Sequence, residues 1–428
     1  MGDKVLKVLS VCTNDSSGGA ARAAHRIHQG VRALGVDSRM FVKDKQSNDE
    51  NVVPLAEFVP SYPLYKVGDW VAKKVKNKWQ HAQWNRYPQR DNVFMSDLRS
   101  TRLHSALQKL DYDVLHLHWI NQRFVPLSEL KKTHKPIVWT LHDSWPFTGI
   151  CHLPYECKGY QKACGCCPFL HSDEANDLSH QVWANKRRCY AGLDLHIVAP
   201  SRWLADCARN SALFHDADIR VIPNCVNTDV FCPGVREEAC AHLGLDPVKR
   251  YVAFGAVNVL TDENKGLKEL VLALNRLEDS SVCQNLELLV YGTESMDGFP
   301  NVPFPVRCLG IIKQEEQMAK IYCCASLTVV PSRSENLSCT IMESLSCGTP
   351  VAAFDIGGNG DMIDHKENGY LARERDDVDL ANGILWCLEN NNDGALSKAA
   401  RQKALDNYTP EIVARQYESL YKSLILRE

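Results

Sequence analysis

The sequence lacks the features that would place it among membrane-spanning, nucleic-acid-binding or secreted proteins. No apolar run approaches the 18 or more residues of a transmembrane helix. Lys and Arg number 49 against 52 Asp and Glu, so the net charge is only -3 and no overall basic field attracts nucleic acid. The first apolar run is interrupted by Lys7, and no small-residue cleavage pattern follows it. We therefore expect a cytoplasmic protein with no nucleic-acid partner.

Cysteine is sparse for a chain held together by disulfides. The 18 Cys of the 428 residues are about 4% of the sequence, and without an export signal this density favours reduced thiols. Hydrophobic residues make up 45% and charged residues 24%, which is ordinary for a globular protein. At roughly 100 to 200 residues per domain, the length predicts two domains or three small ones.

Short apolar runs alternate with helical patterns in two successive series. This alternation predicts parallel sheets with crossover helices, because parallel neighbours need long connections. The first series has strand candidates at 5–12, 38–42, 114–118, 137–142 and 196–200, and the second begins at Arg250. A stretch rich in Pro, Asn and Gly near 221–245 marks the seam. The predicted parts are a first domain over 1–222, a linker over 223–248, a second domain over 249–410 and a C-terminal helix over 411–428 that crosses back to the first domain.

The segment 331–361, PSRSENLSCTIMESLSCGTPVAAFDIGGNGD, carries the most chemistry. A strand ends before it, a polar loop follows, and a helix is predicted from Leu337 to Cys347, ahead of Gly348. Glu335 then lies at the entrance of this helix, and Glu343 lies two turns further along. In open α/β sheets, ligands bind outside the carboxyl ends of the strands, so this loop is a candidate binding site.

The spacing of Glu335 and Glu343, with its flanking residues, resembles the E-x7-E signature of retaining nucleotide-sugar glycosyltransferases of the GT-B fold, in particular glycosyltransferase family four. The resemblance implies an α/β chain with two Rossmann-like domains whose parallel sheets face each other across a cleft. Further segments match the family in order: SGGAARA with Gly18 and Gly19, LHDSWPFTG with His142 and Asp143, PNCVNTDVF at 223–231, NKG at 264–266 and ENGYL at 367–371.

The resemblance implies a role for each matching residue. The C-terminal domain would bind the donor, with Lys265 on its diphosphate, Glu343 on the ribose, and Glu335 with the loop Asn336, Leu337 and Ser338 on the sugar hydroxyls. The N-terminal domain would bind the acceptor through Gly18, Gly19 and Asp143, with His142 as a substrate contact. A departing nucleoside diphosphate accumulates negative charge, which a Lys and helix-terminus amides stabilise without a metal. We therefore expect no cofactor for the catalytic step.

The chain departs from the family pattern at two points. An Arg usually follows the glycine that opens the C-terminal domain, whereas this chain has Ala256, Val257 and Asn258 there. Arg333 is a nearby candidate for the second phosphate-binding cation, and Asn258 is a candidate donor contact. The family's GGxxE ends here in Asp361, which is one methylene shorter.

Five cysteines, Cys151, Cys157, Cys164, Cys166 and Cys167, cluster in the segment 144–171. The C-x2-C spacing of Cys164 and Cys167 suits one Zn²⁺, and Cys151 and Cys157 could complete a tetrahedral structural site. The outer spacings do not match a common zinc finger. Disulfides and free thiols therefore remain as alternatives.

The segment Lys66 to Arg90 holds seven Lys or Arg against one Asp, with Trp70 and Trp79 beside a Val stripe. A basic helix of this kind is typical of an element that lies on an anionic membrane surface. The alternative is a helix packed on the N-terminal sheet with a solvated face. The first interpretation predicts peripheral attachment to the inner face of the membrane.

We expect the protein to transfer a sugar from a UDP- or GDP-sugar to an acceptor hydroxyl with retention of configuration. The HDSWPFTG…CGCCP segment resembles bacterial enzymes that build capsule, O-antigen or colanic-acid-like polysaccharides on lipid-linked acceptors. One alternative is another GT-B reaction, such as UDP-sugar epimerisation or phosphorolysis. The other is a catalytically silent sugar-nucleotide-binding or scaffold protein, which the missing Arg would permit.

Overall fold

The structure is a computed structural model that describes residues 5–58, 84–91, 103, 107–122, 124–256 and 258–426. Most of the basic segment Lys66 to Arg90, including both of its predicted membrane-contacting Trp residues, lies outside the described residues. The chain divides into two compact units: Met1–Ile222 with Ala414–Glu428, here called the N-unit, and Pro223–Val413, here called the C-unit.

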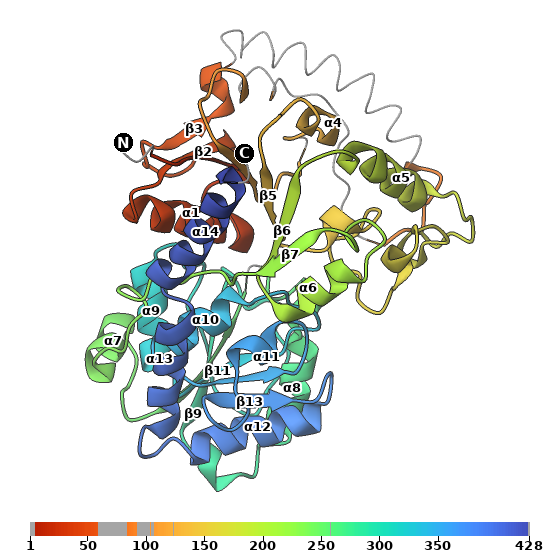
Figure 1. The fold of residues 1–428 in the computed structure, drawn as a ribbon. Helices are drawn as coiled ribbons and strands as arrows, with labels where there is room; N and C mark the ends of the chain where they lie inside the picture. Colours follow the sequence, from red (N-terminus) through yellow and green to blue (C-terminus); the bar gives the residue numbers. More distant parts are fainter. Residues whose placement is uncertain are drawn as a thin grey trace. The chain divides into compact units, whose positions relative to one another are not determined.

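The N-unit is built around a parallel sheet in the order β3-β2-β1-β4-β5-β6-β7 (Figure 1). Its strands are β1 (Lys7–Asn14), β2 (Asp37–Asp44), β3 (Val52–Pro54), β4 (Val114–Leu117), β5 (Ile137–Thr140), β6 (Leu195–Ala199) and β7 (Asp218–Val221). Its helices are α1 (Gly19–Ala33), α4 (Leu127–Leu130), α5 (Leu178–Tyr190), α6 (Arg202–Arg209) and most of α14 (Pro410–Ile425), with short 3-10 turns at 55–58, 145–147, 159–161 and 168–170.

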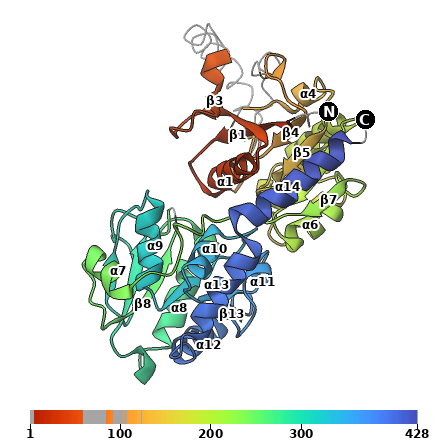
Figure 2. The ribbon, with the colours of Figure 1, turned by 60° about the vertical axis from the view of Figure 1, so that its left-hand side comes forward.

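Side chains of the central N-unit strands β1, β4, β5 and β6 are buried on both faces of the sheet. Leu115 and Leu117 of β4 join the larger core, together with residues of α4 and α6. His116, between them, points to the other face, where α14 runs beside β4 and β5 (Figure 2). A strand that is covered on both faces reads as a nearly continuous apolar run, which is why these strands could be located from the sequence.

The C-unit contains a parallel sheet in the order β10-β9-β8-β11-β12-β13. Its strands are β8 (Arg250–Gly255), β9 (Leu286–Tyr291), β10 (Val306–Cys308), β11 (Leu327–Val330), β12 (Val351–Phe354) and β13 (Gly369–Ala372). Its helices are α7 (Arg236–Leu243), α8 (Leu267–Asn275), α9 (Glu315–Cys324), α10 (Cys339–Ser346), α11 (Asn359–Met362), α12 (Asp377–Glu389) and α13 (Ala395–Asn407), with 3-10 turns at 263–265 and 281–283.

Alternate residues of β8 divide the C-unit core into two layers. Val252 and Phe254 pack with α8 and α12 on one face of the sheet. Tyr251 and Ala253 pack with α7 and α9 on the other face. The parallel α/β architecture, with helices on both faces of the sheet, confirms the predicted fold class. Within the described ranges, no helix is both long and apolar enough to cross a bilayer.

Three strands, one helix boundary and one helix inside the predicted linker differ from the expectations drawn from the sequence. β3, β7 and β13 were not predicted, because β3 and β7 are short strands at the sheet edge and β13 lies within a motif. α10 begins at Cys339 rather than at Leu337, since Ser338 has an extended backbone and forms its N-cap. α7 lies inside the range 223–248 that the sequence analysis assigned to a linker.

Candidate active site

Two loops of the C-unit meet at the carboxyl ends of the adjacent strands β8 and β11. The Arg333 amide donates to the Asn264 carbonyl at 2.8 Å, and Asn264 Nδ2 donates to the Ser334 carbonyl at 2.9 Å. Gly266 has φ 70° at the start of α8, and a Cβ there would lie 1.8 Å from the Pro331 carbonyl oxygen. Only glycine permits this approach, so the glycine of the NKG motif brings the two loops together.

The contact places Lys265 against Glu335. Lys265 Nζ lies 3.0 Å from Glu335 Oε1, and the two side chains remain 25% and 17% exposed. The Glu335 carboxylate raises the pKa of Lys265, so the ammonium is charged at neutral pH. The pair borders a small cavity that Gly255, Ala256, Ser332 and Ser338 also line.

A third loop holds the backbone of Glu335 from the other side. Gly357 has φ 53°, and a Cβ on it would lie 1.7 Å from the Glu335 carbonyl oxygen. The Gly358 amide donates to the same oxygen at 3.3 Å. The GG pair of the motif therefore fits against the entrance loop of α10. Asp361 follows on α11, and its carbonyl accepts a hydrogen bond from the Tyr408 hydroxyl at 2.9 Å.

Arg333 is the sequence candidate for a second phosphate-binding cation, and its guanidinium is already paired. Its Nε donates to Glu269 Oε1 at 2.9 Å, and its Nη1 lies 3.4 Å from Glu263 Oε2. Glu269 is largely buried on α8 and had no signal in the sequence analysis. Asn258, the other candidate in this loop, is exposed and has a left-handed backbone with φ 59°.

The second glutamate of the motif has different surroundings from the first. Glu343 is 3% exposed on α10 and accepts a hydrogen bond from the Tyr322 hydroxyl at 3.3 Å. It does not line the cavity beside Lys265 and Glu335, whereas Ser338 does. Leu337, which lies between Glu335 and Ser338 in the sequence, is buried, and Asn336 precedes it in the same loop. The structure thus joins Lys265 and Glu335 and separates Glu343 from that pair.

In the N-unit, two histidines meet where β4 and β5 end. His118 Nδ1 lies 3.1 Å from His142 Nε2, with one nitrogen donating and the other accepting. Burial lowers the pKa of His142 to about 4, so its imidazole is neutral at neutral pH. A neutral imidazole can both donate and accept hydrogen bonds, which suits contact with sugar hydroxyls.

A ring contact, followed by hydrogen bonds, connects this pair to α14. The His116 ring lies 4.0 Å from that of His118, centroid to centroid. Its Nδ1 lies 2.7 Å from the Tyr421 hydroxyl, and its Nε2 lies 2.8 Å from Thr140 Oγ1. The Tyr417 hydroxyl reaches the same Thr140 oxygen at 2.9 Å. No motif in the sequence indicates this support, although Tyr417 and Tyr421 have the i, i+4 spacing of one helix face.

Asp143 is held on both carboxylate oxygens. Trp119 Nε1 donates to Oδ2 at 3.0 Å, and the Trp145 amide donates to Oδ1 at 2.9 Å. Burial raises the pKa of Asp143. These contacts give Asp143 a structural function at the strand end, directly beside His142.

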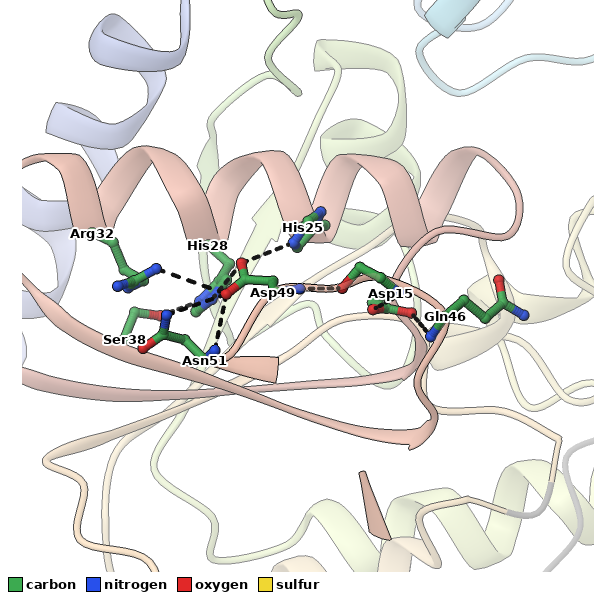
Figure 3. A network of polar contacts seen from close by, with 9 residues as sticks. Asp15, His25, His28, Arg32, Ser38, Gln46, Asp49 and Asn51 are labelled. Carbon is green, nitrogen blue, oxygen red and sulfur yellow. Dashed lines mark hydrogen bonds and ion pairs between the residues drawn. The ribbon is translucent and has the colours of Figure 1, made fainter. Parts of the chain in front are cut away.

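The loop between β1 and α1 carries the predicted acceptor-side glycines. Gly18 has φ 88° as the N-cap of α1, and a Cβ there would meet nothing within 4 Å. Asp15 ties this loop to the one after β2, because its carboxylate accepts from the Gln46 and Ser47 amides at 2.8 and 2.9 Å (Figure 3). Gly18 and Gly19 are exposed. The loop is therefore anchored through Asp15, while its glycines remain exposed to solvent.

A second part of the network in Figure 3 anchors the loop after β2 on α1. Asp49 Oδ2 lies 3.1 Å from His25 Nε2 and 3.9 Å from His28 Nε2, and Asp49 Oδ1 lies 3.9 Å from Arg32. Burial alone would raise the pKa of Asp49, but hydrogen bonds from Asn51 and His25 outweigh it and lower that pKa to about 2.

The four cysteines of the predicted zinc site are free thiols in the structure, as is the neighbouring Cys166. Burial raises the pKa of Cys151 to about 12 and that of Cys164 to about 11, which favours the protonated thiol. Within the part of the chain that the structure describes, no three His, Cys, Asp or Glu side chains are placed to hold a metal ion. As placed, the cysteines do not form a zinc site, and the structural zinc stays a prediction.

A lysine that had no signal in the sequence organises the cysteine segment. Lys186 of α5 is fully buried, and its ammonium donates to the carbonyls of Trp145, Thr148 and Gly149, the last two at 2.9 and 3.1 Å. Its Nζ also lies 3.7 Å from the Trp145 ring centroid. Burial lowers the pKa of Lys186 to about 7. The turn that follows His142 and Asp143 is thus held by one side chain.

Solved structures share the fold of this chain along nearly its whole length. Sucrose-phosphate synthase from Thermosynechococcus elongatus matches with a TM-score of 0.65 at 19% identity, over 99% of this chain and 100% of that one. HepE of Anabaena, solved with UDP and glucose, matches with a TM-score of 0.62 at 16% identity, over 98% and 100%. The chain therefore has the GT-B fold of this class of glycosyltransferases, as its motifs predict.

Family models cover both units. Residues 17–230 match the model Glycosyltransferase Family 4, and residues 250–390 match Glycosyl transferases group 1. The first match spans half of the chain, and the chain belongs to glycosyltransferase family 4.

Curated relatives extend over most of the sequence. WcaC of Escherichia coli K12, named for glycosyl transfer in colanic acid biosynthesis, is 26% identical over 328 residues, which are 74% of this chain and 76% of WcaC. D-inositol 3-phosphate glycosyltransferase of Mycolicibacterium smegmatis is 26% identical over 389 residues, which are 86% of this chain and 78% of that protein. The chain is thus a glycosyltransferase with a relative in polysaccharide biosynthesis.

Proposed function

We propose that this glycosyltransferase moves a sugar from a UDP- or GDP-sugar to a hydroxyl of a glycan or lipid-linked oligosaccharide, with retention of anomeric configuration, in bacterial surface polysaccharide biosynthesis. The observation that carries the proposal is the Lys265–Glu335 pair beside an open cavity at the carboxyl ends of β8 and β11. Ligands bind at this edge in open α/β sheets.

Lys265 and Glu335 would act on opposite sides of the bond that breaks, Lys265 on the diphosphate and Glu335 on the sugar. In the reaction, the bond from the anomeric carbon to the diphosphate oxygen breaks and a bond to the acceptor oxygen forms. Negative charge grows on the leaving diphosphate, and the Lys265 ammonium is the charged group that would meet it. Glu335 would accept hydrogen bonds from the sugar hydroxyls, and the acceptor's proton would leave with the diphosphate. This assignment uses no metal ion.

In the N-unit, His142 would contact the substrate as a neutral imidazole. Its lowered pKa of about 4 excludes a positive charge at neutral pH, so it would bind through hydrogen bonds rather than as a cation. The open loop at Gly18 and Gly19 leaves room for an acceptor close to the backbone.

The nucleotide and acceptor classes are supported by different relatives. HepE of Anabaena has been solved with UDP-glucose, which supports a nucleotide sugar as the donor. The name of WcaC supports a polysaccharide as the product.

A cytoplasmic protein held at the inner face of the membrane by Lys66 to Arg90 would meet a lipid-linked acceptor. Co-sedimentation with anionic vesicles, compared with a Lys73, Lys74, Lys76, Lys78→Glu variant, tests that attachment.

One observation favours a second candidate, a catalytically silent sugar-nucleotide-binding protein. The usual Arg is replaced around Ala256 and Asn258, and the charge of Arg333 is matched by Glu269 and Glu263. Lys265, itself paired with Glu335, would then be the only cation of these two loops, among the described residues, that lines the cavity. Binding without turnover would identify this function.

The deciding experiment incubates the protein with UDP-glucose, UDP-galactose, UDP-N-acetylglucosamine or GDP-mannose, with and without a chelator, and measures nucleoside diphosphate release. Release by the wild type, its loss in Lys265→Ala and its persistence with chelator support metal-independent transfer. Lys268→Ala is the matched control, since Lys268 is an exposed Lys of α8. The anomeric signal of the product in NMR separates retention from inversion.

A further inference from the structure

A second and larger cavity lies in the C-unit, at the edge of the sheet opposite to the candidate donor site. Its volume is about 620 Å³, and Arg250, Ser326 and Pro350 contribute to its wall. Arg250 is the first residue of β8, and Ser326 and Pro350 directly precede β11 and β12. The cavity is therefore at the amino ends of three adjacent parallel strands, whereas Lys265 and Glu335 follow their carboxyl ends.

The two edges are well separated. A four-residue strand such as β11 spans roughly 13 Å at about 3.3 Å per residue. The remaining walls of the cavity come from residues 233–234, α7, α9, the turn after α10, the end of α12 and α13. No residue of these walls also lines the cavity beside Lys265. The larger cavity is thus a distinct feature and not an extension of the donor site.

All the charged side chains that line this cavity are cationic. They are Arg236 on α7, Arg250 on β8, and Lys398 and Arg401 on α13. No Asp or Glu of the described ranges contributes to its wall. Four positive charges around one concave space create a local positive field, which the whole-chain charge of -3 conceals.

The hydrogen bonds of the three arginines fix their positions without cancelling their charge. Arg236 Nη2 donates to the Lys249 carbonyl at 2.7 Å, and Arg250 Nη1 donates to the Val282 carbonyl at 3.3 Å. Arg401 Nη1 donates to the Ser346 carbonyl at 2.7 Å, and its Nη2 donates to the Thr228 carbonyl at 3.1 Å.

Each of these acceptors is a neutral backbone oxygen. Among the described residues, no carboxylate forms an ion pair with any of the four cations. This contrasts with Arg333 in the same unit, whose guanidinium is paired with two glutamates. The cavity therefore carries preorganised positive charge that an anionic ligand would neutralise.

Neutral hydrogen-bonding side chains complete the wall. Asn391, Asn392, Ser397 and Gln402 lie between α12 and α13 or on α13. Ligand pockets of about 300 to 1,000 Å³ commonly combine such polar groups with a few charged ones. The amides and the hydroxyl would recognise hydroxyl groups of a ligand, while the cations would bind its charge.

We propose that this cavity is a second binding site of the protein and that it takes a small phosphate ester, a phosphorylated sugar or nucleoside. Guanidinium groups favour phosphate oxygens as partners, and Arg236, Arg250 and Arg401 bring three of these positive charges to the cavity from separate elements. The volume accommodates a ligand of this size, whereas a bare phosphate would leave most of the cavity unfilled. The proposal does not depend on the sugar-transfer reaction proposed above.

Cys323 provides a readout that reports on this cavity alone. Its thiol lines the wall, and a hydrogen bond from Cys347 lowers the pKa of Cys323 to about 7. A substantial thiolate fraction at pH 7.5 makes it open to alkylation by iodoacetamide. Mass spectrometry of the Cys323 peptide follows its alkylation separately from that of the other cysteines.

The test measures Cys323 alkylation and calorimetric binding with glucose 6-phosphate, AMP, inorganic phosphate and, as a neutral control, glucose. We expect a phosphate ester to bind saturably and to slow Cys323 alkylation, whereas glucose does neither. Lys398→Glu should weaken this binding at least tenfold. Lys313→Glu, which makes the same charge change at an exposed position of the C-unit outside the cavity, should leave it unchanged. Arg250→Gln serves as a second variant that removes one cation without adding an acid.

The donor site is separated from this one by Lys265→Ala. Binding that persists in Lys265→Ala and disappears in Lys398→Glu belongs to the second cavity. Binding that disappears in Lys265→Ala, or that never protects Cys323, belongs to the donor site and overturns the proposal. Absence of saturable binding by glucose 6-phosphate and AMP up to about 10 mM also overturns it, because an affinity weaker than this corresponds to less than about 3 kcal/mol of binding free energy.

Discussion

Lys265 and Glu335 are 70 residues apart in the sequence, yet Lys265 Nζ and Glu335 Oε1 lie 3.0 Å apart beside a cavity at the carboxyl edge of the C-unit sheet. Two glycines make this meeting sterically possible. Gly266 lets its loop approach Pro331, and Gly357 lets a third loop approach the backbone of Glu335. The ion pair is therefore held by backbone contacts that do not depend on its own charges.

Removal of either partner should abolish most turnover and leave the fold intact. Loss of a preorganised stabiliser commonly costs about 2.7 to 4 kcal/mol of activation free energy, which is roughly 100- to 1,000-fold in rate. We expect Lys265→Ala and Glu335→Gln each to lose activity on this scale in a nucleoside diphosphate release assay. Circular dichroism of both variants should match the wild type. Rates near that of the wild type in both would remove the pair from the active site.

His118 should act as a positioning residue for His142, because its Nδ1 is 3.1 Å from His142 Nε2. A neutral hydrogen bond is worth about 0.5 to 1.5 kcal/mol, so His118→Phe should lower kcat roughly 2- to 10-fold. His118→Gln, which keeps a hydrogen-bonding group, should recover part of the loss. The affinity for UDP should not change, since the donor residues lie in the C-unit. Equal rates in the Phe and Gln variants would show that a hydrogen bond from residue 118 does not position His142.

Stability should decrease as the pH falls below 6.5. Burial lowers the pKa values of His28 and His116 to about 3 and that of His142 to about 4. The unfolded chain, with ordinary His pKa values near 6.5, binds more protons between pH 6.5 and 4, so the free energy of unfolding falls in this window. Each His contributes at most about 1.4 kcal/mol per pH unit.

Urea denaturation at pH 7, 6 and 5 checks this dependence. His116→Gln removes one of the three groups, so its slope of stability against pH should be smaller than that of the wild type. The comparison of slopes is independent of any constant loss of stability that the substitution itself causes. Identical slopes would show that His116 does not take up a proton on unfolding.

Lys186→Met should destabilise the N-unit markedly. It leaves the carbonyls of Trp145, Thr148 and Gly149 without their buried donor, and each unpaired buried group costs about 1 to 3 kcal/mol. Arg187→Met is the matched control, because it removes a cation from the adjacent, exposed position of the same helix. Thermal unfolding of the two variants should differ clearly. A similar melting temperature in both would contradict a supporting role for Lys186.

The zinc prediction is tested by metal analysis of protein purified without chelator. A structural site made by Cys151, Cys157, Cys164 and Cys167 should give about one Zn per chain, and Cys164→Ser should lose it together with stability. Binding would require the thiols to deprotonate and to move from their places in the structure, where Cys164 accepts a hydrogen bond from the Gly149 amide at 3.2 Å. Metal-free protein with undiminished stability would assign them as free thiols.

The sequence by itself determined the parallel α/β fold, the family and the positions of the main motifs. These properties follow from local patterns, since apolar runs and helical spacing mark buried elements.

Only the tertiary structure decided which side chains meet. It paired Arg333 with Glu269, placed Glu343 against Tyr322 and joined His116 to Tyr421, which is 305 residues away. It also brought four cations from three elements around one cavity. Local sequence patterns do not indicate such contacts, because the contacts depend on strand order and on the way each helix packs on its sheet.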